Sequence, residues 1–216
     1  MPTILSTKKL DKHQESLLLN AGISYVSYDA IRISPIPICS FPKEVKNAII
    51  TSQNTWKVIK DKVSIENAYV VGEKTSQLLR ENNINIIESQ DYGKDLAHKI
   101  CESHNNEEFY FFCGKKRRNE IPQKLKENNI SFTEIQVYDT LENHKEFKQE
   151  FDGVLFFSPS AVKSFFAENT LKSAIAFCIG TTTAKELEKH TNHIIIANQP
   201  TIENVIVQVV KKYKND

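Results

Sequence analysis

Short apolar runs alternate with segments of helical periodicity along almost the whole chain, and this alternation limits the possible folds more than any other feature. Runs rich in Val, Ile and Phe are typical of strands in parallel sheets, which are buried on both faces. The segments between them place apolar residues three and four positions apart, as amphipathic helices do. The pattern therefore predicts an α/β fold with parallel sheets flanked by helices. The predicted strands are 3–7, 47–51, 68–71, 84–87, 109–113, 153–157, 175–179 and 193–197, and the predicted helices are 74–82, 95–103, 119–128, 161–167, 184–190 and 202–212.

Composition excludes some classes of partner. The chain has 216 residues with 28 basic and 27 acidic side chains, and its net charge is +1. A chain of this length can bury one large core or two small ones. Because the charges nearly cancel, no overall field indicates binding to nucleic acid or to a membrane. The N-terminal stretch lacks the apolar core of a signal peptide, so we expect a cytoplasmic protein.

Cysteine and histidine give no sign of a metal site. The four cysteines (Cys39, Cys101, Cys113 and Cys178) form no C-x-x-C pair, which indicates a reducing compartment. The six histidines show neither H-E-x-x-H nor another ligand spacing. We therefore expect no bound metal.

One strand-turn-helix pattern occurs twice. "NAIITSQNTWKVIKD" (47–61) matches "GVLFFSPSAVKSFFAE" (153–168), which aligns Ser52 with Ser158. Gly72 follows Ser52 by 20 residues and Gly180 follows Ser158 by 22, and both glycines begin Gly-x-x-Thr at the start of a predicted helix. Two turns in the same order at similar separation predict an internal duplication.

Two extended stretches could connect two domains. Residues 31–42 contain three prolines, which disfavour a helix, and residues 131–144 alternate apolar and polar side chains. If both stretches cross between domains, residues 38 to about 138 form a domain inserted into the other. If only one does, two consecutive domains meet near residue 140. Periodicity alone does not decide between these arrangements.

The repeated turns are candidate anion-binding sites. Ligands of parallel α/β sheets lie beyond the carboxyl ends of the strands, where free N–H groups of helix starts attract carboxylates and phosphates. Serine and threonine are also preferred helix N-caps, so each residue taken alone is explained as well by capping. As a paired arrangement they favour binding, and the candidates are Thr51, Ser52, Gly72, Lys74 and Thr75 in one copy and Ser158, Ser160, Gly180, Thr182 and Thr183 in the other.

The most basic stretch, "CGKKRRNEIPQKL" (113–125), follows a predicted strand and leads into a helix. Its four consecutive cations could bind an anion or could form a solvated charge run. The chain contains neither a P-loop nor G-x-G-x-x-G, so no nucleotide cofactor is indicated. Aromatic residues are not interleaved with these cations, and binding to nucleic acid is therefore not expected.

No conventional catalytic motif is present, since neither serine turn reads G-x-S-x-G. A polar cleft without a nucleophile or metal would bind a ligand without reacting, or would catalyse by holding a reactive substrate in one conformation.

Several segments together resemble the uroporphyrinogen-III synthases in order and spacing, over nearly the whole chain. The most specific are F-F-S-P-S followed by I-G-x-T-T-A, and Gly114-x-x-x-Arg118 followed by Pro122. The sequence departs from the common pattern at Ala161 and around Trp56. The segments are "IITSQNTWKVI", "YVVGEKTSQLL", "FFCGKKRRNEIPQKLKENNI", "VYDT", "VLFFSPSAVKSFF", "CIGTTTAKEL" and "ANQPTIENV".

The resemblance implies a nested domain arrangement. Residues 1–35 with 142–216 would form one α/β domain, and residues 38–138 a second, similar domain joined to it by a two-stranded connection. A flexible cleft would separate the two domains.

The resemblance also implies an activity. Members of that family are lyases of haem biosynthesis that convert hydroxymethylbilane, a linear tetrapyrrole, into cyclic uroporphyrinogen III. Water is lost, the last pyrrole ring is inverted through a spiro intermediate, and no cofactor is used. A monomer is expected, with a transient contact to hydroxymethylbilane synthase conceivable. The alternative from another class is a non-catalytic two-domain protein that binds a small polycarboxylate anion.

Tyr138, in "QVYDT", matches the family's tyrosine that is assigned the role of acid when the hydroxyl group departs. Taken without the resemblance, it is explained as a half-buried strand aromatic. By the same resemblance, Gly114 and Arg118 join the substrate-binding candidates, and Thr182 and Thr183 are expected to bind substrate carboxylates.

Overall fold

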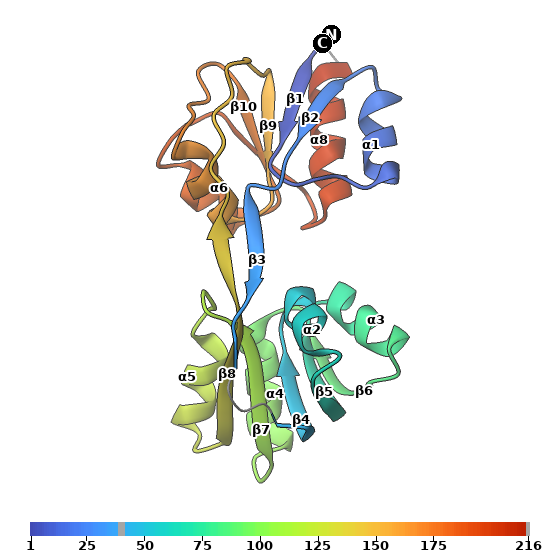
Figure 1. Cartoon of the computed structure of the whole chain (residues 1–216), viewed down its shortest axis with the longest axis vertical. Coiled ribbons are helices and arrows are strands. Elements are labelled where there is room, and N and C mark those ends of the chain that lie inside the picture. The colour runs from blue at the N-terminus through green and yellow to red at the C-terminus, as the bar shows by residue number, and fades with distance from the viewer. Residues whose placement is uncertain (39–41, 215–216) are drawn as a thin grey trace. The chain divides into compact units, whose positions relative to one another are not determined.

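The computed structural model describes residues 1–38 and 42–214, which form two compact units. The first unit comprises residues 1–32 and 141–216, and the second comprises residues 33–140. Strand β3 (Ile31–Pro35) leads from the first unit into the second, and β8 (Ser131–Glu142) leads back. The two strands are neighbours and run in opposite directions (Figure 1). Cys39, one of the four cysteines considered above, lies outside the described residues.

The first unit contains a five-stranded sheet in the order β11-β10-β9-β1-β2, with every neighbouring pair parallel. Helices α6 and α7 pack together over one face, and α1 and α8 pack together over the other. Alternate residues of one strand supply the two cores, as Leu5 faces α6 and α7 while Ile4 faces α1 and α8. The elements are β1 (Thr3–Ser6), α1 (Lys12–Leu19), β2 (Ser24–Ser27), β9 (Gly153–Phe156), α6 (Pro159–Phe166), β10 (Ile175–Cys178), α7 (Thr181–Leu187), β11 (Ile194–Ile196) and α8 (Ile202–Lys214).

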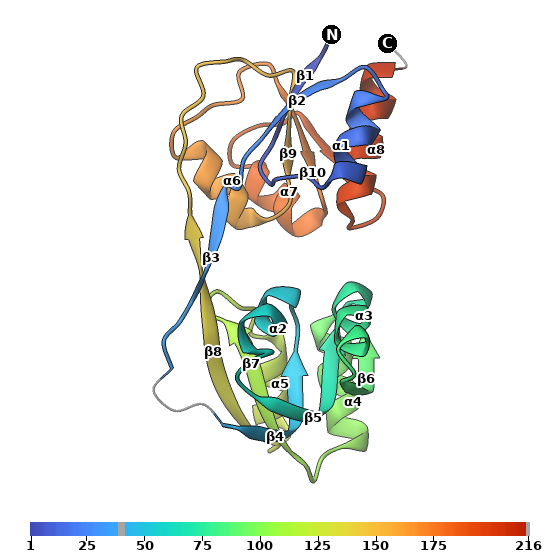
Figure 2. The ribbon, with the colours of Figure 1, turned by 45° about the vertical axis from the view of Figure 1, so that its right-hand side comes forward.

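The second unit contains a six-stranded sheet in the order β3-β8-β7-β4-β5-β6, and its strands from β8 to β6 are parallel (Figure 2). Helices α2 and α3 cover one face, where Trp56 and Phe112 are buried, and α4 and α5 cover the other, where Tyr69 and Phe111 are buried. The remaining elements are β4 (Glu44–Ile50), α2 (Gln53–Ile59), β5 (Ser64–Val71), α3 (Glu73–Glu81), β6 (Asn85–Gln90), α4 (Gly93–Ser103), β7 (Glu108–Gly114) and α5 (Glu120–Glu127).

Five strands of each sheet have the same spatial order, although they follow one another in a different order along the chain. The order β2-β1-β9-β10-β11 in the first unit corresponds to β8-β7-β4-β5-β6 in the second. The predicted repeat is therefore a strand-helix-strand-helix segment, β9-α6-β10-α7 in one unit and β4-α2-β5-α3 in the other. The remaining parts also correspond, so β1-α1-β2 matches β7-α5-β8, and α8 matches α4.

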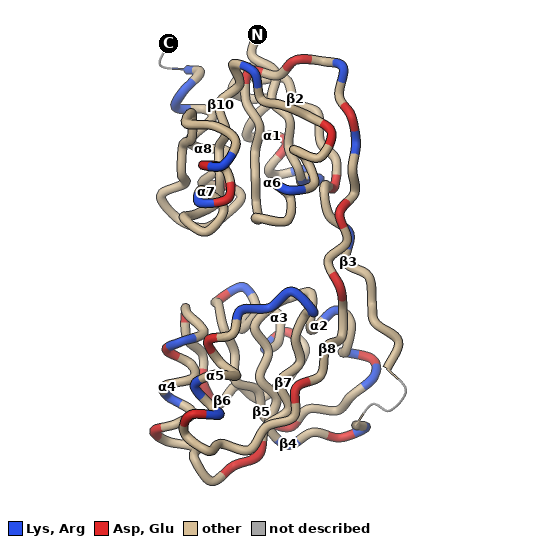
Figure 3. The backbone as a smooth tube through the Cα atoms, turned by 90° about the vertical axis from the view of Figure 1, so that its left-hand side faces the viewer, with Lys and Arg blue, Asp and Glu red and all other residues tan. Residues whose placement is uncertain are grey.

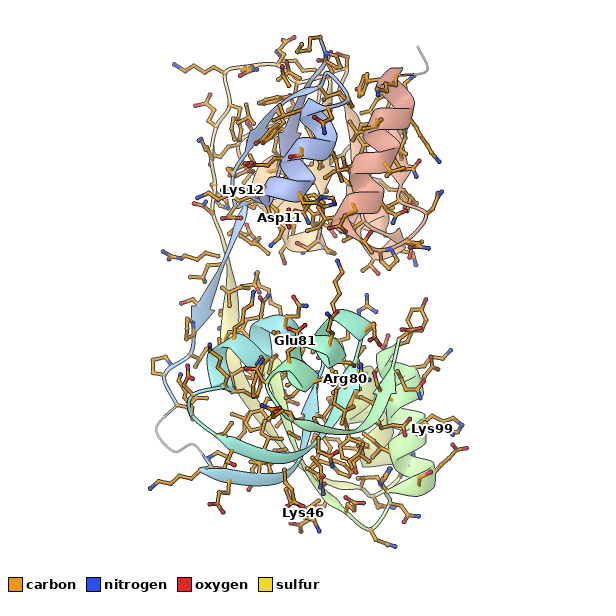
Figure 4. The ribbon with its side chains drawn as sticks, turned by 90° about the vertical axis from the view of Figure 1, so that its right-hand side faces the viewer. Asp11, Lys12, Lys46, Arg80, Glu81 and Lys99 are labelled. Carbon is orange, nitrogen blue, oxygen red and sulfur yellow. The ribbon has the colours of Figure 1, made fainter. Side chains whose placement is uncertain are left out.

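The end of α1 and the end of α5 show how closely the units correspond. The amide of Ile23 donates to the carbonyl of Leu18 at 3.1 Å after α1, and the amide of Ile130 donates to that of Leu125 at 3.0 Å after α5. The starts of these helices differ. Asp11 caps α1 by accepting from the amide of Gln14 at 2.9 Å (Figure 4), whereas α5 has no side-chain cap.

The aligned serines occupy equivalent positions. Ser52 and Ser158 are the N-caps of α2 and α6, and their side chains accept from the amides of Asn54 and Ala161, each at 3.1 Å. The aligned glycines precede α3 and α7 but differ in backbone conformation. Gly72 has φ +88°, which favours glycine, whereas Gly180 has φ 175°, which any residue adopts.

All eight predicted strands and all six predicted helices are present, with shifted ends. Helix α7 begins at Thr181 rather than residue 184, so the three consecutive threonines form its first turn. The sequence analysis missed β2, because its four residues show no sustained alternation. No helix within residues 1–38 and 42–214 has the length and apolar character needed to cross a membrane.

Candidate active site

A pocket of about 270 Å³ lies in the second unit at the carboxyl ends of its strands. The chain proceeds from β4 to β5 and β6 on one side and from β7 to β8 on the other, so strand order reverses between β4 and β7. Such a reversal opens the crevice in which α/β proteins bind ligands. Residues after both strands line the pocket, namely Thr51 and Ser52 after β4, and Gly114, Lys116, Arg117 and Arg118 at the end of β7 and after it.

Tyr138 of β8 also lines this pocket, and its ring lies directly against Gly114. The register between β7 and β8 shifts after Cys113, which pairs Gly114 with Tyr138. A Cβ atom on Gly114 would stand 2.6 Å from Cζ and 2.8 Å from the hydroxyl oxygen of Tyr138. The amide of Lys115 donates to the carbonyl of Tyr138 at 2.8 Å. A side chain at position 114 would therefore displace the end of the Tyr138 ring from this position.

The basic run from Lys115 to Arg118 forms one loop between β7 and α5, which Figure 3 shows as a continuous blue stretch. Lys115 lies 3.4 Å from the carboxylate of Asp139, and Lys116 donates to the carbonyl of Thr140 at 3.2 Å. These contacts, with that of Arg117 below, hold the loop against β8. Arg118 is exposed at the pocket.

Arg117 and Glu134 form a two-pronged ion pair, with Nε donating at 3.0 Å and Nη2 at 2.6 Å. The guanidinium group lowers the pKa of Glu134 and the carboxylate raises that of Arg117. Burial, together with the nearby Glu134, raises the pKa of the Cys113 thiol to about 12. Cys113 is buried and is not among the residues that line the pocket.

The other candidates of the second unit lie in the neighbouring turn. Gly72, Lys74 and Thr75 follow β5 and are not among the pocket's lining residues. The side chain of Gln53 donates to the carbonyl of Lys74 at 2.9 Å and so ties this turn to the start of α2. Thr75 is buried, and its amide donates to the carbonyl of Gly72 at 3.0 Å.

The candidates of the first unit lie at the carboxyl ends of β9 and β10 and in the helix turns that follow. Ser158 and Ser160 are half-buried at the start of α6, and Gly180 precedes α7. Thr182 is exposed, whereas the side chain of Thr183 is buried with the residue 3% exposed. Of the two threonines, Thr182 is the one presented to solvent.

The sequence analysis missed several residues at these edges. Asp91, Tyr92, Gly93 and Glu120 line the pocket of the second unit. Lys8 of the first unit follows β1, at the place that the basic run occupies after β7. Lys8 can be recognised as the counterpart of the basic run only once β1 and β7 are known to correspond.

No cluster within residues 1–38 and 42–214 brings together three His, Cys, Asp or Glu side chains in a way that could hold a metal ion.

Known proteins resemble this chain in sequence and in structure. Residues 15–206 match the family described as Uroporphyrinogen-III synthase HemD. The chain belongs to this family. A relative from Ruminiclostridium josui, described as "Porphyrin biosynthesis protein HemD", is 26% identical over 225 residues, which cover 90% of this chain. The match covers only 45% of that relative, so the chain spans about half of its length.

Two solved structures share the fold. A uroporphyrinogen-III synthetase from Helicobacter pylori has a TM-score of 0.76 at 18% identity, covering 98% of this chain and 100% of its own. A mutant uroporphyrinogen III synthase from Thermus thermophilus has a TM-score of 0.63 at 13% identity, covering 100% of this chain and 99% of its own. At these identities they support the fold alone, which agrees with the two α/β units expected of a uroporphyrinogen-III synthase.

We predict that Gly114→Ala destabilises the protein by about 1–3 kcal/mol, because the new methyl group must displace the ring of Tyr138. In a Tyr138→Ala background the same substitution should cost less than about 0.5 kcal/mol. Urea unfolding of the four proteins measures this difference. An equal cost in both backgrounds would show that the ring is not seated on Gly114.

We predict that Glu134 stabilises the protein in a pH-dependent manner. Its pKa in the folded protein lies below 4.5, its ordinary value, so this stabilisation is complete above about pH 4.5 and is lost as the pH falls through the lowered pKa. The difference in free energy of unfolding between the wild type and Glu134→Gln should therefore shrink in acid. Urea unfolding at pH 7, 5, 4 and 3 tests this, and a difference independent of pH would contradict it.

Proposed function

We propose that this chain converts hydroxymethylbilane into uroporphyrinogen III, with loss of water and inversion of ring D, in tetrapyrrole (haem) biosynthesis. The observation that carries the proposal is that Tyr138 and Arg118 both line the pocket at the reversal of strand order between β4 and β7. Family membership supports this reaction over simple binding of a polycarboxylate anion.

Tyr138 would assist the first bond to break. The terminal hydroxyl group leaves as water after it accepts a proton or a strong hydrogen bond, and the rest of the substrate becomes an azafulvene cation. A phenolic hydroxyl is a suitable donor for this step. The ring of Tyr138 is half-buried and held over Gly114, so its hydroxyl group has a defined position at the pocket.

The remaining candidates would bind and orient the substrate, which carries eight carboxylates. In the pocket, Arg118 and Lys116 provide cations, and the start of α2 behind Thr51 and Ser52 provides amide groups. We assign supporting contacts to Gly72, Lys74 and Thr75 in the same unit. Once the azafulvene has formed, the remaining steps depend more on the geometry of attack than on a catalytic group. Binding the substrate in a fixed orientation supplies that geometry.

In the first unit we propose that Ser158, Ser160, Gly180, Thr182 and Thr183 bind carboxylates of the same substrate. We further propose that the protein acts in the cytoplasm as a monomer and receives its unstable substrate by transient contact with hydroxymethylbilane synthase. The three cysteines that the structure describes are all free thiols, which supports a reducing compartment.

Thr182 and Thr183 should behave differently when substituted. Thr182 is exposed in the first turn of α7, so Thr182→Ala should raise KM for hydroxymethylbilane about tenfold and leave stability nearly unchanged. Thr183 is buried, so Thr183→Ala should destabilise the protein by about 1–2 kcal/mol and change KM less. Steady-state kinetics and urea unfolding separate the two effects. A KM unchanged by Thr182→Ala would limit that residue to a structural role.

The activity is tested by supplying freshly generated hydroxymethylbilane and separating the isomers of the product. Uroporphyrinogen III above the spontaneous background is the expected result. We predict that Tyr138→Phe lowers kcat about a hundredfold or more, because the proton donor is lost, while the unfolding midpoint stays within a few degrees. Formation of only the I isomer by the wild type would instead indicate a binding protein. Unchanged turnover by Tyr138→Phe would remove the role of Tyr138 as the acid.

A further inference from the structure

We propose that Tyr92 is a substrate-binding residue of the second unit, and that its ring provides the flat face on which one pyrrole ring of the substrate stacks. The inference rests on the proposed function, since it takes a tetrapyrrole as the ligand.

Tyr92 lies between β6 and α4, at the carboxyl edge of the sheet. It lines the pocket that contains Tyr138 and also a second hollow, which shares three lining residues with that pocket. Arg118 and Glu120 also line both spaces. Tyr92 is 66% exposed, and its ring therefore contributes little to the core of the unit.

The local structure does not explain a tyrosine at this position. Tyr92 is the N-cap of α4, and its carbonyl accepts from the amides of Asp95 and Leu96 at 3.2 and 3.1 Å. Its side chain makes no capping hydrogen bond. Serine, threonine, aspartate or asparagine would satisfy a free amide there and stabilise the helix. The side chain of Tyr92 therefore adds no stabilising hydrogen bond to the start of α4.

The first unit contains the matched case. Helix α8 corresponds to α4, and Thr201 precedes it as Tyr92 precedes α4. The carbonyl of Thr201 accepts from the amide of Val205 at 3.2 Å, and its hydroxyl group accepts from the amide of Asn204 at 3.1 Å. The fold therefore accepts a capping threonine at this position, and the aromatic ring is particular to the second unit.

The surrounding charges favour contact with a ring over contact with an anion at the start of α4. A carboxylate oxygen of Glu120 lies 3.3 Å from the point where a Cβ atom of Gly93 would stand, so the positive end of this helix already faces a carboxylate. Carboxylates of the substrate are better placed beside the guanidinium group of Arg118. A pyrrole between those carboxylates would then meet the exposed face of Tyr92, and aromatic rings attract one another in such stacked arrangements.

The test compares the wild type with Tyr92→Thr, which copies the first unit, and with Tyr92→Phe, which keeps the ring. Tyr92→Thr should raise the unfolding midpoint by a few degrees because it adds a cap. The same variant should raise KM for hydroxymethylbilane about three- to tenfold, with little change in kcat. Tyr92→Phe should keep the wild-type KM. A purely structural residue would not produce higher stability together with weaker binding.

Ile87→Thr is the control, because it removes an exposed apolar side chain from β6 that does not line the pocket, and its KM should equal that of the wild type. An unchanged KM in Tyr92→Thr would overturn the proposal. An equal loss in Tyr92→Phe would also overturn it, because the contact would then belong to the hydroxyl group.

A binding measurement separates this inference from the proposed function. Uroporphyrin III, the oxidised form of the proposed product, is titrated into the wild type and into Tyr92→Thr, with an approximately three- to tenfold higher Kd expected for the variant. If the wild type produces only the I isomer but this difference in Kd is found, the proposed reaction fails and the role of Tyr92 stands. If uroporphyrinogen III is produced and neither KM nor Kd changes, the role of Tyr92 alone fails.

Discussion

The absence of a side chain at Gly114 is the constraint on which the candidate active site depends. Because position 114 lacks a Cβ atom, β8 can place the ring of Tyr138 against the end of β7, where strand order reverses. The ion pair between Arg117 and Glu134 and the contact between Lys115 and Asp139 then hold the basic loop against β8. The tyrosine and the cations of this loop are consequently brought to one edge of the sheet, where the proposed reaction needs them to orient its substrate.

The basic run shows why a charge pattern does not reveal which of its members bind a ligand. Sequence alone offers four equivalent cations, and the structure shows that Lys115, Lys116 and Arg117 contact residues of β8, while Lys116, Arg117 and Arg118 line the pocket. The partners Glu134, Asp139 and Thr140 lie about 20 residues away in the chain, and no local pattern identifies them. The basic run therefore holds its own loop against β8 and also provides positive charge at the pocket.

Periodicity predicted the long apolar strands and the amphipathic helices, because burial on both faces of a parallel sheet constrains their composition. It missed β2, which has four residues and is not fully buried. The repeat predicted equivalent caps at Ser52 and Ser158 but not the different backbone at Gly72 and Gly180. Tyr92 was missed because a tyrosine before a helix matches no capping pattern, and its correspondence with Thr201 requires the order of both sheets.

The correspondence between the units also explains why the proposed acid lies in the second. Thr7 follows β1 where Gly114 ends β7, and its hydroxyl group donates to the carbonyl of Leu155 at 2.7 Å. Tyr28, which follows β2 and precedes an aspartate as Tyr138 does, is packed into the core and is only 5% exposed. Burial raises the pKa of Tyr28 to about 12, and its hydroxyl group has no hydrogen-bond partner among the described residues. A tyrosine so enclosed cannot reach a ligand, whereas the same residue type over a glycine can. Two sheets with one spatial order thus place the same residue type differently, in the core of the first unit and at the pocket of the second.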